Sequence, residues 1–163
     1  RNSLKIRQLA THCETSGVAH HIFPLGNGWG VKFFATMRAR NFMTQILVVD
    51  DNPIIRKLLG VALSRHFTVC EAPDVDSALA CVLQHKPRIV FLDIMMPSAN
   101  EGLELLETLR QHPETSNILV AMVSSHTDPE TRALAAEKGA DAYFSKPFNL
   151  QEIAAWADKH LAP

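Results

Sequence analysis

The chain has 163 residues, of which 47% are hydrophobic and 20% charged, so it carries enough apolar side chains for a packed core and is not a disordered chain. The formal net charge of −1 is unevenly distributed, because residues 44–163 carry 10 basic and 16 acidic side chains, a balance that argues against direct binding to nucleic acid. Three cysteines without a CxxC pair favour reduced thiols over a disulfide framework, and no apolar stretch has transmembrane length, so we expect a cytoplasmic protein that does not bind membranes.

Residues 1–43 differ in pattern from the rest of the chain. The segment PLGNGWG is typical of turns, and no sustained helical or strand period surrounds it. The histidines and the cysteine of this region lack the spacing of a zinc-binding motif. We therefore expect residues 1–43 to be a poorly ordered extension and residues 44–163 to form the functional domain.

From Gln45 onward, short apolar runs alternate with segments of helical period. In chain order, the runs are ILVV, FTVC, RIVFL, ILVAMV and AYF. Because they are apolar on both faces, they are typical of parallel strands that are covered by helices on each side of the sheet. The chain is therefore predicted to be an α/β protein built from five successive strand–helix units.

Capping residues mark where four of the five predicted helices begin, and the apolar period alone places the third. In chain order, these starts are Asn52-Pro53, Asp74, about Glu101, the capping box Thr127-Asp128-Pro129-Glu130, and Asn149. The third helix is expected to end near Gln111 and the fourth at Gly139. In the first helix, six apolar residues recur with helical period and predict a broad buried stripe: Ile54, Ile55, Leu58, Leu59, Ala62 and Leu63.

Polar side chains follow four of the five predicted strands. In chain order, they are Asp50 and Asp51, then Asp93, then Ser124 and Ser125, and finally Lys146. The carboxyl ends of parallel strands meet at one edge of a sheet, which is where ligands bind in such folds, so these groups are expected to converge. Any one of them alone is more often a helix cap, a surface residue or part of a solvated turn, so the interpretation depends on their joint occurrence.

Three converging carboxylates cannot all stay ionised without a counter-charge, and one lysine is too little. Ligation by oxygen alone favours Mg²⁺, with Mn²⁺ as a substitute. A metal, a lysine and a hydroxyl directed at one point would form a clamp for phosphoryl oxygens. Asp93, the central carboxylate, would then be a nucleophile that becomes an aspartyl phosphate.

The motifs LVVDDN, VFLDIMMP, MVSSH and GADAYFSKPF resemble, in this order, those of the receiver domains of bacterial two-component response regulators, over residues 44–162. The resemblance implies a flavodoxin-like, doubly wound (βα)5 fold with five parallel strands in the order 2-1-3-4-5. It also implies Mg²⁺-dependent transfer of a phosphoryl group from a histidine kinase or phosphotransfer protein to Asp93. Such a domain is a signalling module rather than an enzyme, similar to the stand-alone chemotaxis regulators.

The same resemblance implies a role for each matching residue. Asp51 corresponds to the direct metal ligand and Asp50 to the acid that holds metal-bound water. Asp93 corresponds to the phosphoacceptor and a metal ligand, and the backbone carbonyl of Met95 to a further ligand.

Lys146 corresponds to the lysine that binds the phosphoryl group, and its bond to Pro147 is expected to be cis. Ser124 corresponds to the switch hydroxyl and Tyr143 to the switch aromatic. The switch would remodel a surface on the fourth helix, fifth strand and fifth helix, which binds an unknown downstream protein.

Three positions depart from the usual family pattern. Four residues separate Pro97 from Gly102 where the family usually has three. Ser125 replaces Ala or Gly, and its added hydroxyl is expected to narrow access to the phosphorylated site. Met95 stands where some relatives have a polar residue that orients the attacking water, so self-dephosphorylation is expected to be slow.

A degenerate receiver that binds its partner without phosphorylation is the main alternative. An enzyme of the haloacid-dehalogenase class would need a second aspartate at the position of Met95, and a flavin-binding relative would have its phosphate repelled by Asp50 and Asp51. No DNA-binding or catalytic module follows the fifth helix, so we expect a stand-alone receiver, with a piece of a longer protein as the alternative.

Overall fold

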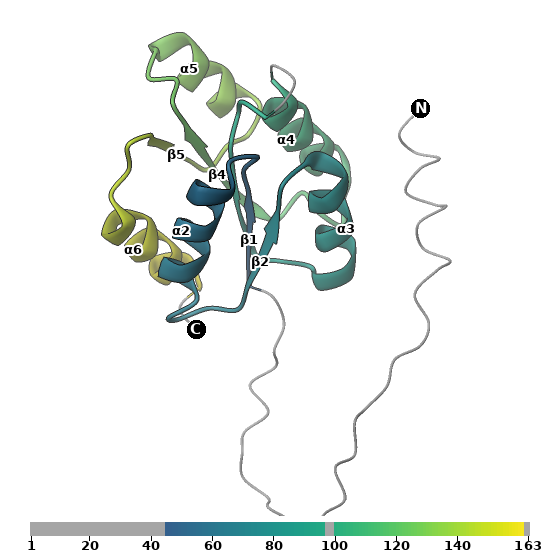
Figure 1. Ribbon diagram of the computed structural model, residues 1–163. Helices are drawn as coiled ribbons and strands as arrows, with labels where there is room; N and C mark the ends of the chain where they lie inside the picture. Colours follow the sequence, from purple (N-terminus) through teal and green to yellow (C-terminus); the bar gives the residue numbers. More distant parts are fainter. Residues whose placement is uncertain (1–44, 97–99, 162–163) are drawn as a thin grey trace, which may run out of the picture. The chain divides into compact units, whose positions relative to one another are not determined.

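The computed structural model describes residues 45–96 and 100–161, so the predicted extension at residues 1–43 lies outside the described residues (Figure 1). Within them, five strands alternate with five helices. These are β1 Ile46–Val49, α2 Pro53–Leu63, β2 Val69–Ala72, α3 Val75–His85, β3 Ile89–Leu92, α4 Glu101–Gln111, β4 Leu119–Ser124, α5 Pro129–Glu137, β5 Ala142–Ser145 and α6 Leu150–Leu161. None of the helices found there combines the length and the hydropathy that a membrane span requires.

The five strands form one parallel sheet in the order β2-β1-β3-β4-β5, which confirms the predicted doubly wound fold. The β1 and β3 strands are paired so that Val49 lies beside Leu92 at their carboxyl ends. As a result, the residues that follow these two strands emerge side by side. The β2 strand begins at Val69, two residues later than the predicted run FTVC.

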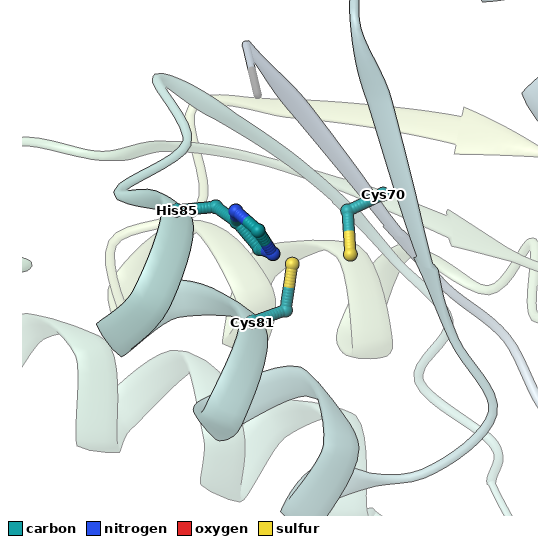
Figure 2. Close-up of side chains that lie close together, drawn as sticks. All are labelled: Cys70, Cys81 and His85. Atoms are coloured by element: carbon teal, nitrogen blue, oxygen red, sulfur yellow. The ribbon is translucent and has the colours of Figure 1, made fainter. Parts of the chain in front are cut away.

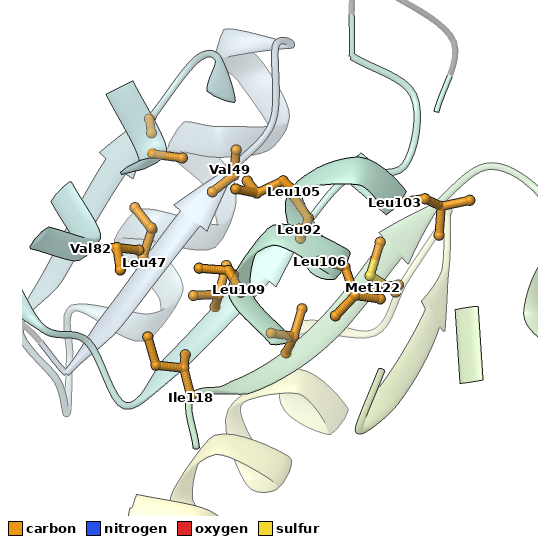
Figure 3. Close-up of a cluster of buried hydrophobic side chains, with 14 of the residues drawn as sticks. Leu47, Val49, Val82, Leu92, Leu103, Leu105, Leu106, Leu109, Ile118 and Met122 are labelled. Atoms are coloured by element: carbon orange, nitrogen blue, oxygen red, sulfur yellow. The ribbon is translucent and has the colours of Figure 1, made fainter. Parts of the chain in front are cut away.

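Helices cover both faces of the sheet (Figure 1). Side chains of α3, α4 and α5 pack with one face of the strands, and those of α2 and α6 pack with the other. Successive strand residues point to opposite faces, so in β1 Leu47 joins the first cluster while Ile46 joins the second. Figure 3 shows the first cluster, in which Leu92 and Met122 of the strands meet Leu106 of α4. Burial on both faces explains why the strands are almost wholly apolar.

Two details of the helices differ from the predictions. The α5 helix is capped by Asp128, whose Oδ1 accepts a hydrogen bond from the Thr131 N–H at 2.7 Å, so the predicted capping box beginning at Thr127 is wrong. Pro129 occupies the first helical position and forces the residue before it into an extended conformation, which makes that residue the cap.

The predicted buried stripe of α2 is also too broad. Leu59 and Leu63 are buried, but Ile54 is 75% exposed and Leu58 is 45% exposed. The helix packs on β1, β2 and α6, and this contact covers a narrower part of its surface than six apolar positions span.

Candidate functional site

Charged side chains from three strand ends meet at the carboxyl edge of the sheet. Asp50 directly follows β1, Asp93 directly follows β3, and Lys146 directly follows β5. The Lys146 Nζ lies 2.7 Å from Asp50 Oδ2 and 2.6 Å from Asp93 Oδ2. One ammonium group therefore bridges two carboxylates. Asp50 and Asp93 are 43 residues apart in the sequence but adjacent in space, because β1 and β3 are paired.

A third carboxylate, that of Asp51, completes the cluster. One carboxylate oxygen from each of Asp50, Asp51 and Asp93 lies within 4.8 Å of the others. Asp50 is 1% exposed and Asp93 is 5% exposed, whereas Asp51 is exposed to solvent. Three carboxylates beside one ammonium leave an excess of negative charge in a largely buried place, and the donors are all oxygens. These residues therefore fit a hard divalent cation such as Mg²⁺, with access from the Asp51 side.

The pKa values of Asp93 and Lys146 are both raised, but for different reasons. Burial raises the pKa of Asp93, and the hydrogen bond and charge of Lys146 oppose this rise only in part. For Lys146, burial works against the charged form, but hydrogen bonds to Asp50 and Asp93 outweigh it and raise the pKa. Lys146 therefore remains a cation at neutral pH.

Both carboxylate oxygens of Asp93 have partners. Oδ2 accepts from Lys146, and Oδ1 accepts a hydrogen bond from the Met95 N–H at 3.2 Å. Met95 itself is 41% exposed. The Lys146–Pro147 bond is cis, as the resemblance implied.

The loop after β1 is held by Asn52, which was predicted only as a helix cap, and by Arg56, for which no role was predicted. The Asn52 N–H donates to Asp50 Oδ1 at 2.9 Å, and Nη1 of Arg56 donates to the Asp50 backbone carbonyl at 2.6 Å. Arg56 lies on the first turn of α2. The only sign of its role in the sequence is that a basic residue follows shortly after the acidic pair. The first bond orients the Asp50 carboxylate, and the second holds the main chain that carries it.

The two predicted switch residues are connected through the main chain of His126. The Ser124 side chain is fully buried, and its Oγ accepts a hydrogen bond from the His126 N–H at 3.1 Å. The Tyr143 hydroxyl donates to the His126 carbonyl at 2.7 Å, and the Arg132 guanidinium lies 4.9 Å from the centre of its ring. Burial raises the pKa of Tyr143, so the hydroxyl keeps its proton. The role of His126 depends on backbone atoms, so its side chain offered no signal in the sequence.

Seven positions were predicted as site residues, and the structure arranges them in two neighbouring groups. The first contains the three carboxylates, Lys146 and the Met95 backbone, and the second contains Ser124 and Tyr143. A main-chain bond from the Lys146 N–H to the Ser124 carbonyl, 2.8 Å long, joins the two groups.

The chain is similar in sequence and in fold to known proteins. The family model of the response regulator receiver domain matches residues 46–158. The nitrogen assimilation regulatory protein NtrX of Azorhizobium caulinodans is 36% identical over 119 residues, which cover 71% of this chain and 26% of that protein. The phosphate regulon transcriptional regulatory protein PhoB of Pseudomonas aeruginosa is 34% identical over 111 residues, which cover 68% of this chain and 48% of that protein. The chain thus spans about half or less of the length of these curated relatives.

Solved structures show the same similarity. The receiver domain of NtrX from Brucella abortus has a TM-score of 0.64 and 39% identity, with 72% of this chain and 98% of that chain covered. The BeF3-activated receiver domain of DrrB has a TM-score of 0.67 and 26% identity, with 74% and 99% covered.

Proposed function

The chain belongs to the response regulator receiver family of two-component systems, and from this membership we propose that Asp93 accepts a phosphoryl group from a histidine kinase or phosphotransfer protein. Receiver domains are signalling domains. The observation that supports this proposal most directly is the Lys146 ammonium, which is held between the carboxylates of Asp50 and Asp93 at the carboxyl edge of the sheet. A lysine in that place is positioned to bind an oxygen of a group attached to Asp93.

In the proposed reaction, Asp93 is the nucleophile. An ionised carboxylate needs no general base, so the attacking oxygen forms the new O–P bond while the N–P bond of a phosphohistidine donor breaks and the imidazole leaves. Mg²⁺, held by Asp50, Asp51, Asp93 and the Met95 carbonyl, would supply positive charge to the phosphoryl oxygens. Lys146 would move its hydrogen bond from Asp93 Oδ2 to a phosphoryl oxygen. The pairing of both Asp93 oxygens before reaction fixes the carboxylate plane, which favours approach from the open Asp51 side.

The proposed output is a change in the surface formed by α5, β5 and α6. A phosphoryl group adds acceptor oxygens beside β4, so the Ser124 hydroxyl would leave the His126 N–H and donate to the phosphoryl group. His126 would shift with it and weaken its bond to Tyr143, whose ring could then turn inward. The downstream partner would bind one of the two arrangements preferentially.

The direct test is exposure of the protein to acetyl phosphate, followed by intact-mass measurement. With Mg²⁺ or Mn²⁺ we expect one phosphoryl adduct that is lost at alkaline pH, and with EDTA we expect none, because nothing then offsets the excess negative charge. A folded protein that forms no adduct with either cation would instead be a receiver that works without phosphorylation.

Replacing Met95 with Asn should shorten the lifetime of the phosphorylated protein. Met95 is exposed beside Asp93, and a polar amide there can hold water near the phosphorus atom, which the thioether cannot. The lifetime is measured from the decay of the adduct mass after the phosphodonor is removed. Met95→Leu is the matched control and should leave the decay unchanged, and equal decay of Met95→Asn and wild type would contradict the prediction.

A further inference from the structure

Three side chains with metal-binding atoms converge between β2 and α3. Cys70 lies on β2, and Cys81 and His85 lie one turn apart on α3, so both face the strand. The two sulfur atoms and a ring nitrogen of His85 all lie within 4.8 Å of one another. Figure 2 shows both sulfurs and the imidazole ring directed into the same space.

This cluster is separate from the acidic site. Cys70 is paired with Leu47 in the sheet, three residues before Asp50, which corresponds to about 10 Å along the strand. The α3 helix runs back from the carboxyl edge, and His85 is its last residue. The cluster therefore lies toward the amino ends of the strands.

We propose that Cys70, Cys81 and His85 form a binding site for Zn²⁺, with two thiolates and one imidazole nitrogen as ligands and water as the fourth. Sulfur and imidazole are the donors that Zn²⁺ selects, whereas Mg²⁺ prefers oxygen. The half-buried Cys70 and His85 give the cation a path from solvent, while the buried Cys81 anchors the site in the core.

Binding exchanges protons for the cation and transfers no electrons. Each thiol releases its proton to solvent as its sulfur bonds to Zn²⁺. A disulfide between Cys70 and Cys81 would use the same sulfurs, but it would require an oxidant and would leave the convergence of His85 unexplained. In the metal-free protein, burial and the adjacent Cys70 thiol raise the pKa of Cys81, which keeps the Cys81 thiol protonated and slow to oxidise.

A bound cation would fasten an edge strand to the helix that covers it. Among the strands that the structure describes, β2 pairs only with β1 and lies at one end of the sheet. A ligand that binds the folded chain and not the unfolded chain stabilises the folded state by mass action. Zn²⁺ should therefore raise the melting temperature of the reduced protein.

The test uses Co²⁺ as a spectroscopic probe on the full chain carrying Cys13→Ser. In this background Cys70 and Cys81 are the only thiols, so any thiolate-to-cobalt charge-transfer band must arise from them. Excess Mg²⁺ keeps the acidic site from contributing. We expect a near-ultraviolet band that saturates at one equivalent of Co²⁺ and disappears when Zn²⁺ is added.

Single substitutions then test the proposed ligands one at a time. Cys70→Ser and His85→Gln should each weaken Co²⁺ binding by more than about tenfold, and the Zn²⁺-induced rise in melting temperature should disappear in both. His66→Gln, at an exposed histidine outside the cluster, is the matched control and should change neither value. Circular dichroism verifies that every variant is folded.

The proposal is overturned if no charge-transfer band forms or if His85→Gln binds Co²⁺ like the parent. It is also overturned if the reduced protein forms a Cys70–Cys81 disulfide in air and has no affinity for Zn²⁺.

Discussion

Asp93→Asn should abolish phosphorylation and leave the protein at least as stable as the wild type. The amide cannot form an acyl phosphate, so no adduct should appear with acetyl phosphate and Mg²⁺ under conditions that label the wild type completely. The stability expectation comes from burial. The carboxyl group of Asp93 is 5% exposed, and its raised pKa means that the folded protein disfavours the ionised form. Lys146 keeps its bond to Asp50 in the variant.

The pH dependence of stability provides a second measurement on the same variant. A carboxyl whose pKa is raised on folding contributes stability below its unfolded pKa of about 3.9, and this contribution is lost as the pH rises through the folded value. The wild type should therefore lose stability relative to Asp93→Asn across that window, with EDTA present throughout. Asp76→Asn, at an exposed position in the first turn of α3, serves as the control and should be phosphorylated normally. An adduct on Asp93→Asn would place the phosphoacceptor on another residue.

The parallel, helix-covered sheet and the residues at its acidic edge could be predicted because they depend on local patterns, whereas the order of the strands was implied by the family resemblance. Each strand is a short apolar run, and its last residue determines which side chain reaches the edge. Thus Asp50 and Asp93 could both be expected at the carboxyl edge, and the strand order implied by the resemblance placed them side by side. The width of the buried stripe on α2 was overestimated because that prediction also used a local pattern alone. Periodicity shows how many apolar residues share one face of a helix, but not how much of that face other elements cover. The exposure of Ile54 depends on packing with β1, β2 and α6.

Other features could not be predicted because they join distant segments or backbone atoms. Cys70 and Cys81 show no metal-binding spacing in the sequence, and only the packing of α3 on β2 brings them together with His85. The two bonds to the His126 main chain leave no trace in residue type, and a basic residue after the acidic pair is the only sign of the bond from Arg56 to the Asp50 carbonyl. The choice of Asp128 over Thr127 as the α5 cap was readable in principle, because Pro129 fixes the first helical position.

Gly102→Ala should be the most destabilising single-methyl substitution at a glycine of the described structure. Gly102 lies in the first turn of α4, and its N–H donates to the Ile94 carbonyl at 3.2 Å. A Cβ atom at this position would overlap the backbone oxygen of Asp93 and lie 2.8 Å from the Cα of Ile94. Both obstacles are main-chain atoms at the end of a central strand that is paired on both sides, so they cannot move aside. The added methyl group should cost about 3 kcal/mol of unfolding free energy.

Gly60→Ala is the matched comparison, because Gly60 is also a buried glycine in a helix. A Cβ atom there would meet the carboxylate end of Glu71, a flexible side chain that forms ion pairs with Arg56 and Lys57 and can rotate toward solvent. Alanine is also favoured over glycine within a helix by about 1 kcal/mol, so the net change should be close to zero. Urea denaturation of both variants measures the difference. Similar stabilities would mean that α4 can withdraw from β3 at little cost. In that case, the close approach of Gly102 would not be what sets the position of Asp93. If Gly102→Ala is strongly destabilised as expected, the close packing of α4 on the end of β3 requires glycine at position 102. The position of the Asp93 carboxylate then depends on this packing.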